Sequence, residues 1–104
     1  MCREVLAGLI RENESNYTNS FRIMQDQLCA TKHMNIQCSG ATCVLAHVYD
    51  DIIKVANLGD SRCVLGRSIM SNPSNVQAIP LSTDHKPDRP DEMERIIASG
   101  GQVG

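Results

Sequence analysis

The spacing of the apolar residues changes near residue 40. Up to residue 33 they recur at steps of three and four, which places them on one face of a helix. From residue 42 onward they gather into short runs rich in β-branched side chains, which is typical of strands. A helical region followed by a strand region predicts an α+β fold.

Two helices are predicted within residues 1–33. Residues 2–10 carry the first apolar face, and residues 13–19 are rich in Asn, Ser and Thr, which favour turns and helix caps. Asn19 or Ser20 is the expected cap of the second helix, which should end near Lys32.

Strands are predicted between about residues 42 and 81. The first two should cover residues 42–49 and 52–57, because these runs are apolar, rich in β-branched residues and of strand length. Asp50 and Asp51 suit the tight turn between them. An antiparallel hairpin is therefore expected here.

The rest of the strand region is predicted to continue as a meander. After a turn at residues 59–60, residues 61–66 form the expected third strand, paired with the second. Residues 68–75 carry Ser, Asn and Pro in the manner of a surface loop. Residues 76–81 form the expected fourth strand, where Pro80 indicates an edge or the end of pairing.

A last helix is predicted over about residues 90–99. Pro90 suits the first turn of a helix, and Gly100 lies where a helix commonly ends. Three apolar residues of this helix are expected to face inward: Met93, Ile96 and Ile97.

The composition predicts one small domain, or part of one, over residues 1–104. The chain is 41% hydrophobic and only 3% aromatic, so aliphatic side chains must build the core and independent stability should be marginal. Five cysteines, an odd number, lie in apolar segments, which predicts buried, unpaired thiols in an intracellular compartment, cytoplasmic or nuclear. They are Cys2, Cys29, Cys38, Cys43 and Cys63.

Charge and hydropathy argue against two classes of partner. The formal net charge is -2, with both signs mixed along the chain, so no basic surface is predicted for nucleic acid. No apolar run approaches the roughly 20 residues of a membrane span, and no signal peptide is recognisable at the N-terminus. Neither nucleic acid nor a membrane is expected as a partner.

Several short motifs follow one another in a fixed order through the second part of the chain. They are SGAT at 39–42, VANLGDSR at 55–62, LSTDHKP at 81–87, ERI at 94–96 and GG at 100–101. In order and spacing, the region from about residue 39 to residue 103 resembles type 2C serine/threonine protein phosphatases. Several ordered motifs are far more specific than any one alone.

The resemblance implies a fold, a cofactor and a reaction. The fold is an α-β-β-α sandwich of antiparallel strands flanked by helices, of which this chain would form an internal part. The implied cofactor is a pair of Mg or Mn ions. They activate a water molecule, which attacks the phosphate of a phosphoprotein substrate in signalling. In the family the principal metal ligands include an Asp-Gly-His-Gly-Gly motif and two downstream aspartates, which this sequence does not contain.

Asp60 is the one metal-site candidate that the resemblance supplies. The matching position in the family lies on a turn facing the metal centre and is associated with a further, weaker metal site. Gly59 relieves the steric limits of such a turn, and Arg62 is expected to orient or pair with the carboxylate. The alternative is that Asp60 only caps its own turn.

Other polar residues are given structural rather than catalytic roles. Asp84 is interpreted as a turn acceptor, and His85 as a histidine with a structural hydrogen bond; Lys86 beside them is given no catalytic role. Glu94 and Arg95 are interpreted as part of a solvated helix face rather than as an ion pair with neighbouring turns, and they are given no catalytic role.

Neither a serine or threonine nucleophile nor a zinc site is predicted. Ser39 and Thr42 lack a recognisable triad pattern, and their small size suits entry into a strand. The residues that would have to ligate zinc match no paired spacing: His33, Cys38, Cys43 and His47.

Two functions remain open from the sequence. One is that the chain is part of an active Mg- or Mn-dependent phosphatase, while being inactive alone because one carboxylate cannot hold two metals. The other is a phosphatase-like adaptor or interaction module without catalysis. Uncovered sheet faces also predict that the isolated chain self-associates.

Overall fold

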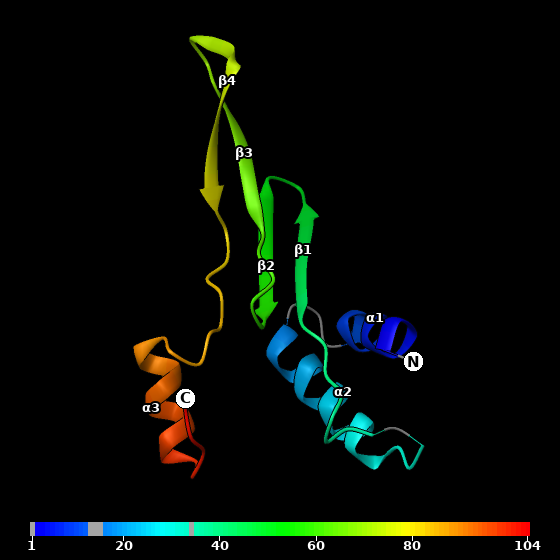
Figure 1. Cartoon of the computed structure of the whole chain (residues 1–104). Helices are drawn as coiled ribbons and strands as arrows, with labels where there is room; N and C mark the ends of the chain where they lie inside the picture. The colour runs from blue at the N-terminus through cyan, green and yellow to red at the C-terminus, as the bar shows by residue number, and fades with distance from the viewer. Residues whose placement is uncertain (1, 13–15, 34) are drawn as a thin grey trace. The chain divides into compact units, whose positions relative to one another are not determined.

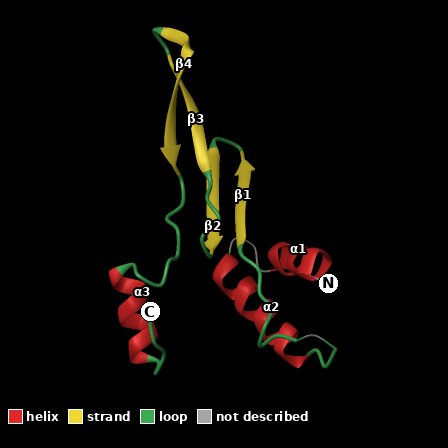
Figure 2. Ribbon diagram, viewed as in Figure 1, coloured by secondary structure: helices red, strands yellow, loops and turns green. Residues whose placement is uncertain are grey.

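The computed structural model describes residues 2–12, 16–33 and 35–104 of the chain. This part contains three helices and four strands (Figures 1 and 2) and divides into two compact units, Met1–Gly40 and Ala41–Gly104. Helices and antiparallel strands occupy separate stretches of sequence, so the α+β class is confirmed. That residues 1–104 belong to a single domain stays a prediction.

The first unit is a pair of helices, α1 (Cys2–Glu12) and α2 (Tyr17–Ala30). The predicted cap of the second helix was wrong by one turn, because the Asn16 side chain accepts the Asn19 N–H at 3.2 Å. Ser20 is instead fully buried, and its hydroxyl donates to the Leu9 carbonyl at 3.2 Å. A small polar residue is therefore placed where the two helices meet.

The core of this unit is small. Leu9 and Met24 are its buried apolar side chains among the described residues, with Met24 only 5% exposed. Among the described residues of this core no aromatic side chain is buried, so each core residue removes little area from water. The marginal stability expected from the composition stays a prediction.

The second unit begins with the predicted hairpin of β1 (Cys43–Tyr49) and β2 (Ile52–Leu58). The strands are antiparallel and in register from Cys43 opposite Leu58 to Tyr49 opposite Ile52. Asp50 turns the chain with φ of 49°, a left-handed conformation that Asp tolerates better than most residues. The predicted hairpin and its turn are confirmed.

The predicted meander was wrong. β3 (Val64–Ile69) does not pair with β2 but with β4 (Asn72–Pro80), so the described strands form two separate two-stranded sheets. Residues 68–75, predicted as a loop, belong largely to this second hairpin. The turn covers residues 70 and 71, and Asn72 and Ser74 follow it within β4, where the Asn72 side chain accepts both the Ser74 N–H (3.3 Å) and hydroxyl (2.6 Å). Residue types that favour loops thus stand inside a strand, which explains the error.

The third helix, α3 (Pro90–Ala98), begins and ends as predicted. Pro90 is its first residue, and Gly100 adopts φ of 85° just beyond it. The Gly100 N–H donates to the Ile97 carbonyl at 3.0 Å and the Gly101 N–H to the Ile96 carbonyl at 2.9 Å, which is a Schellman motif. The inward placement of Ile97 was wrong, since this side chain is 58% exposed.

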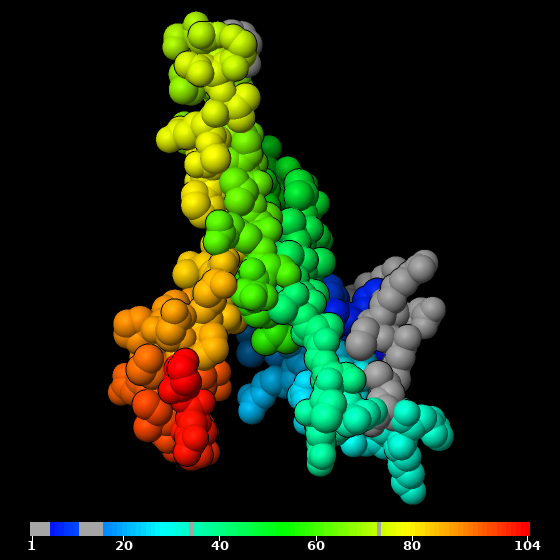
Figure 3. Space-filling model, in the orientation of Figure 1, coloured from blue at the N-terminus to red at the C-terminus, as the bar shows by residue number. Residues whose placement is uncertain are grey.

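Apolar surface and cysteines also depart from the expected burial. Large aliphatic side chains of both hairpins are exposed, and Figure 3 shows the uncovered turn between β3 and β4. Cys29 and Cys38 were predicted to be buried but are exposed, whereas Cys43 and Cys63 are partly buried. The side chain of Cys2 lies outside the described residues. Within the described ranges, every helix is too short or too polar to cross a bilayer.

Candidate functional site

The candidate site is built on the turn that follows β2. Gly59 adopts φ of 110° here, and a Cβ at this position would collide with the side chain of Thr42. Only glycine fits such a conformation next to a neighbouring side chain. Asp60 follows it with an exposed side chain, and Ser61 then bonds back to Thr42 through the two hydroxyl oxygens at 2.7 Å.

A second segment of the same unit, residues 81–89, lies along this turn. We call residues 57–63 and 81–89 together the junction. At one end the Leu81 N–H donates to the Cys63 carbonyl and the Cys63 N–H to the Ser82 hydroxyl, both at 2.9 Å. At the other end the His85 N–H donates to the Gly59 carbonyl at 2.9 Å. The His85 bond therefore fixes the turn that carries Asp60, whereas the Leu81 and Ser82 bonds hold Cys63, the residue before β3.

Two side chains tie the junction together next to Asp60. The Gly59 N–H donates to His85 Nδ1 at 3.3 Å, and Asn57 Nδ2 donates to the carbonyls of Gly59 at 3.2 Å and Thr83 at 3.0 Å. Asn57 Oδ1 is buried and has no hydrogen-bond partner among the described residues. The prediction of a structural hydrogen bond for His85 is confirmed.

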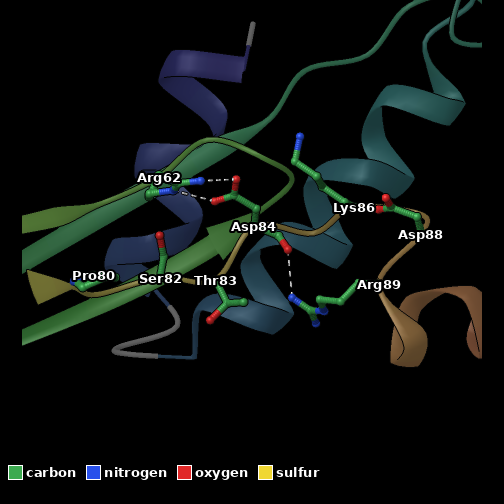
Figure 4. Close-up of a pocket in the computed structure, with 8 residues that line it drawn as sticks. All are labelled: Arg62, Pro80, Ser82, Thr83, Asp84, Lys86, Asp88 and Arg89. Carbon is green, nitrogen blue, oxygen red and sulfur yellow. Dashed lines mark hydrogen bonds and ion pairs between the residues drawn. The ribbon is translucent and has the colours of Figure 1, made fainter.

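Arg62 does not pair with Asp60, so that expectation was wrong. Its guanidinium donates through Nε and Nη2 to the two carboxylate oxygens of Asp84, at 3.0 and 2.8 Å (Figure 4). The planar guanidinium of arginine suits two parallel bonds of this kind, and the two carboxylate oxygens of Asp84 accept them both. Asp84 is therefore an ion-pair partner rather than the acceptor of its own turn.

The ion pair acts on the acidity of Asp84. The hydrogen bonds from Arg62 lower the pKa of the Asp84 carboxyl, and the charges of Arg62 and Lys86 act in the same direction while burial opposes them. The Asp84 side chain is 15% exposed, so its carboxylate lies largely within the junction.

The segment then passes into α3 through Arg89. Its Nη1 donates to the Asp84 carbonyl at 2.9 Å, and its other nitrogens form two bonds of 2.6 Å with Asp91 in the first helical turn. These bonds hold the pKa of Asp91 down at about 2. Further along the helix Arg95, whose side chain is 65% exposed, pairs with Glu92 at 2.7 Å.

A shallow groove of about 540 Å³ runs along the junction. Figure 4 shows the Arg62 guanidinium bonded to the Asp84 carboxylate, while Arg89 reaches the Asp84 backbone carbonyl. Its lining contains three basic and two acidic side chains beside small polar ones: Arg62, Pro80, Ser82, Thr83, Asp84, Lys86, Asp88 and Arg89. Most of the charge is already paired within the protein.

Metal coordination at this turn would depend on the carboxylate of Asp60. An exposed Asp60 carboxylate is a hard oxygen donor and fits one ligand position of Mg²⁺ or Mn²⁺. Within the described ranges, however, no three or more His, Cys, Asp or Glu side chains come together to hold an ion. The described residues therefore do not fit a two-metal centre by themselves.

Sequence reasoning missed the partners that organise the site. Asn57 and Thr83 are 26 residues apart, and so are Gly59 and His85, while Arg62 and Asp84 are 22 apart. No local pattern links positions so distant. The available signal was that all of these residues belong to two motifs, at residues 55–62 and 81–87, that occur together.

Comparison with known proteins matches the sequence of this chain to one family. The family described as Protein phosphatase 2C matches residues 4–104. Probable protein phosphatase 2C 78 of Arabidopsis thaliana is 38% identical over 98% of this chain and 28% of its own length. Probable protein phosphatase 2C 75 of the same plant is 53% identical over 73% of this chain and 17% of its own length.

A rice relative gives a similar result. Probable protein phosphatase 2C 8 of Oryza sativa subsp. japonica is 55% identical over 64% of this chain and 15% of its own length. The chain thus spans no more than 28% of the length of these three relatives. No solved structure gives a significant match.

Proposed function

The chain belongs to the protein phosphatase 2C family, and from this premise we propose that its parent protein is a serine/threonine protein phosphatase. The proposed reaction is hydrolysis of phosphoserine and phosphothreonine in proteins by water. The observation that carries the proposal is the family match over residues 4–104, which includes the junction that displays Asp60.

We propose Mg²⁺ or Mn²⁺ as the cofactor of the complete domain and Asp60 as one ligand of a peripheral site. When bound, such ions neutralise phosphate charge and activate the attacking water. Asp60 itself contributes an exposed carboxylate on a turn whose backbone is held by His85 and Asn57. The remaining ligands would come from outside the described residues, in the longer protein.

For the isolated chain we propose the absence of catalysis. A single carboxylate cannot fix two ions in a defined geometry, so purified Met1–Gly104 should release no phosphate above background. We also retain an intracellular location as a proposal, supported by the four free cysteines among the described residues and testable by cell fractionation.

The proposal is tested with the longer protein, meaning this chain with its flanking coding sequence. Phosphate release from phosphoserine, phosphothreonine and phosphotyrosine peptides is measured with added Mg²⁺ or Mn²⁺ and again with a chelator. We expect release from the first two peptides, lost on chelation. Robust metal binding without hydrolysis of any peptide would instead support the non-catalytic interaction module.

A further inference from the structure

The backbone of Gly59 is held on both sides by side chains and by a neighbouring segment. Its N–H donates to His85 Nδ1 at 3.3 Å, and its carbonyl accepts the His85 N–H at 2.9 Å and Asn57 Nδ2 at 3.2 Å. Both polar groups of the residue before Asp60 are thus fixed. The backbone direction from which the Asp60 side chain leaves is set by these three bonds.

We propose that His85 and Asn57 are positioning residues, which hold the Asp60 carboxylate in place through Gly59 and without contacting a ligand themselves. The proposal rests on the proposed function, because the position of Asp60 matters for a metal only in the phosphatase. In this proposal His85 of the LSTDHKP motif orients a metal ligand, whereas an ordinary structural hydrogen bond would only stabilise the fold.

The histidine must present an acceptor at one particular ring atom. Because Nδ1 accepts the Gly59 N–H, this nitrogen carries no proton and the ring proton lies on Nε2. An asparagine places its side-chain oxygen near the position of Nδ1, whereas a glutamine places its oxygen near that of Nε2. His85→Asn should therefore keep the bond, and His85→Gln and His85→Leu should lose it.

Asn57 acts on the same residue through its amide donors. Its Nδ2 bonds the carbonyls of Gly59 and Thr83, which uses both hydrogens and joins the end of β2 to the 81–89 segment. An aspartate at position 57 would replace these donors by an oxygen that faces two carbonyl oxygens. Asn57→Asp should therefore release Gly59 although the side chain keeps its size.

The junction also contains bonds that stabilise it at a distance from Asp60. The Ser82 hydroxyl accepts the Cys63 N–H at 2.9 Å, on the far side of the turn from Gly59. Ser82→Ala removes this acceptor and leaves the His85 and Asn57 bonds in place. It is the matched control for a role in stability alone.

The experiment uses the longer protein and measures Mn²⁺ affinity by calorimetry together with amide hydrogen exchange at Gly59. We expect His85→Leu, His85→Gln and Asn57→Asp to weaken Mn²⁺ binding at the weakest site by about tenfold, as for other residues that orient a metal ligand, and to speed exchange at Gly59. His85→Asn should restore most of both. Ser82→Ala should lower the unfolding midpoint with Mn²⁺ affinity unchanged.

Two results would overturn the proposal: wild-type Mn²⁺ affinity and Gly59 protection in His85→Gln, or an equal loss of Mn²⁺ affinity in Ser82→Ala. Should His85→Leu fail to fold, the two polar variants, Asn and Gln, decide the matter alone. Failure of the proposed function would look different. The wild-type protein would then release no phosphate, whereas His85→Asn and His85→Gln would still differ in Mn²⁺ affinity and in amide exchange at Gly59.

Discussion

At the scale of single residues, position 59 accepts the narrowest range of amino acids. It combines φ of 110° with a position against Thr42, so any Cβ meets both backbone strain and a steric clash. Asp60 depends on this residue, because the carboxylate leaves the backbone at the next position. The identity of residue 59 is therefore coupled to the proposed metal ligand.

Gly59→Ala is predicted to destabilise the chain by about 1 to 3 kcal/mol, the usual range for a residue held in a disfavoured backbone region. Urea unfolding followed by circular dichroism measures this loss. Gly40→Ala is the control, because a Cβ there has no heavy atom within 4 Å. Equal stability of the two variants would contradict the strain assigned to residue 59.

The Arg62–Asp84 pair predicts a particular dependence of stability on pH. The pKa of Asp84 is lowered in the folded state, so its contribution is complete above the ordinary carboxyl value of about 4 and is lost as the pH falls below it. Asp84→Asn should be less stable than wild type at pH 7, and the difference should shrink below about pH 4.

Unfolding midpoints in urea, measured from neutral pH to about pH 2 on the wild type and the variant, test this expectation. Asp26→Asn, at an exposed position of α2, controls for the loss of a negative charge. A difference between wild type and Asp84→Asn that stays constant down to the lowest pH would show that the pair does not act through its charge.

At the scale of elements, local signals were enough to predict where the helices and the first hairpin occur. Pro90 and Gly100 marked the ends of α3, and Asp50 with Asp51 marked the first hairpin, because each residue acts on its own backbone. Pairing between elements was not predictable in this way.

The failure of the meander shows why. Residues 61–66 were predicted to pair with β2, yet the backbone groups of Cys63 and Gly59 bond to residues 81–85. This choice depends on residues about twenty positions away and leaves no periodic signal. The same long-range contacts form the candidate site, so the site geometry was missed for the same reason as the sheet topology.

The Schellman motif at the end of α3 gives a prediction for one element. Gly100→Ala should cost about 1 to 2 kcal/mol, because φ of 85° is unfavourable for a residue with a Cβ. Gly100→Asn should cost less, since asparagine tolerates this region. Unfolding midpoints of the three proteins test the order, and an alanine variant as stable as wild type would contradict the motif.

At the scale of the whole molecule, the chain exposes large apolar side chains on both hairpins. Val48 is 67% exposed on the first hairpin and Val76 is 64% exposed on the second. Both sheets have only two strands in the described part of the chain, so every strand also has an open edge. Exposed faces and open edges together favour association.

We therefore predict that purified Met1–Gly104 forms dimers or larger species at micromolar concentration. A double substitution, Val48→Lys with Val76→Lys, should lower the mass measured by light scattering toward that of the monomer, because it places a charge on the exposed face of each hairpin. Gln77→Lys adds charge at an exposed polar position and should have little effect. A wild-type chain that is monomeric and unfolds cooperatively would contradict the prediction.

We propose above all that Asp60 of this chain is one metal ligand of a protein phosphatase. The most direct test is the Mn²⁺ concentration needed for phosphate release from a phosphothreonine peptide by the longer protein, compared between wild type and Asp60→Asn. The predicted result is metal-dependent release by the wild type and at least about a tenfold higher Mn²⁺ requirement in the variant. Release that is independent of metal, or identical Mn²⁺ curves for the two proteins, would contradict it.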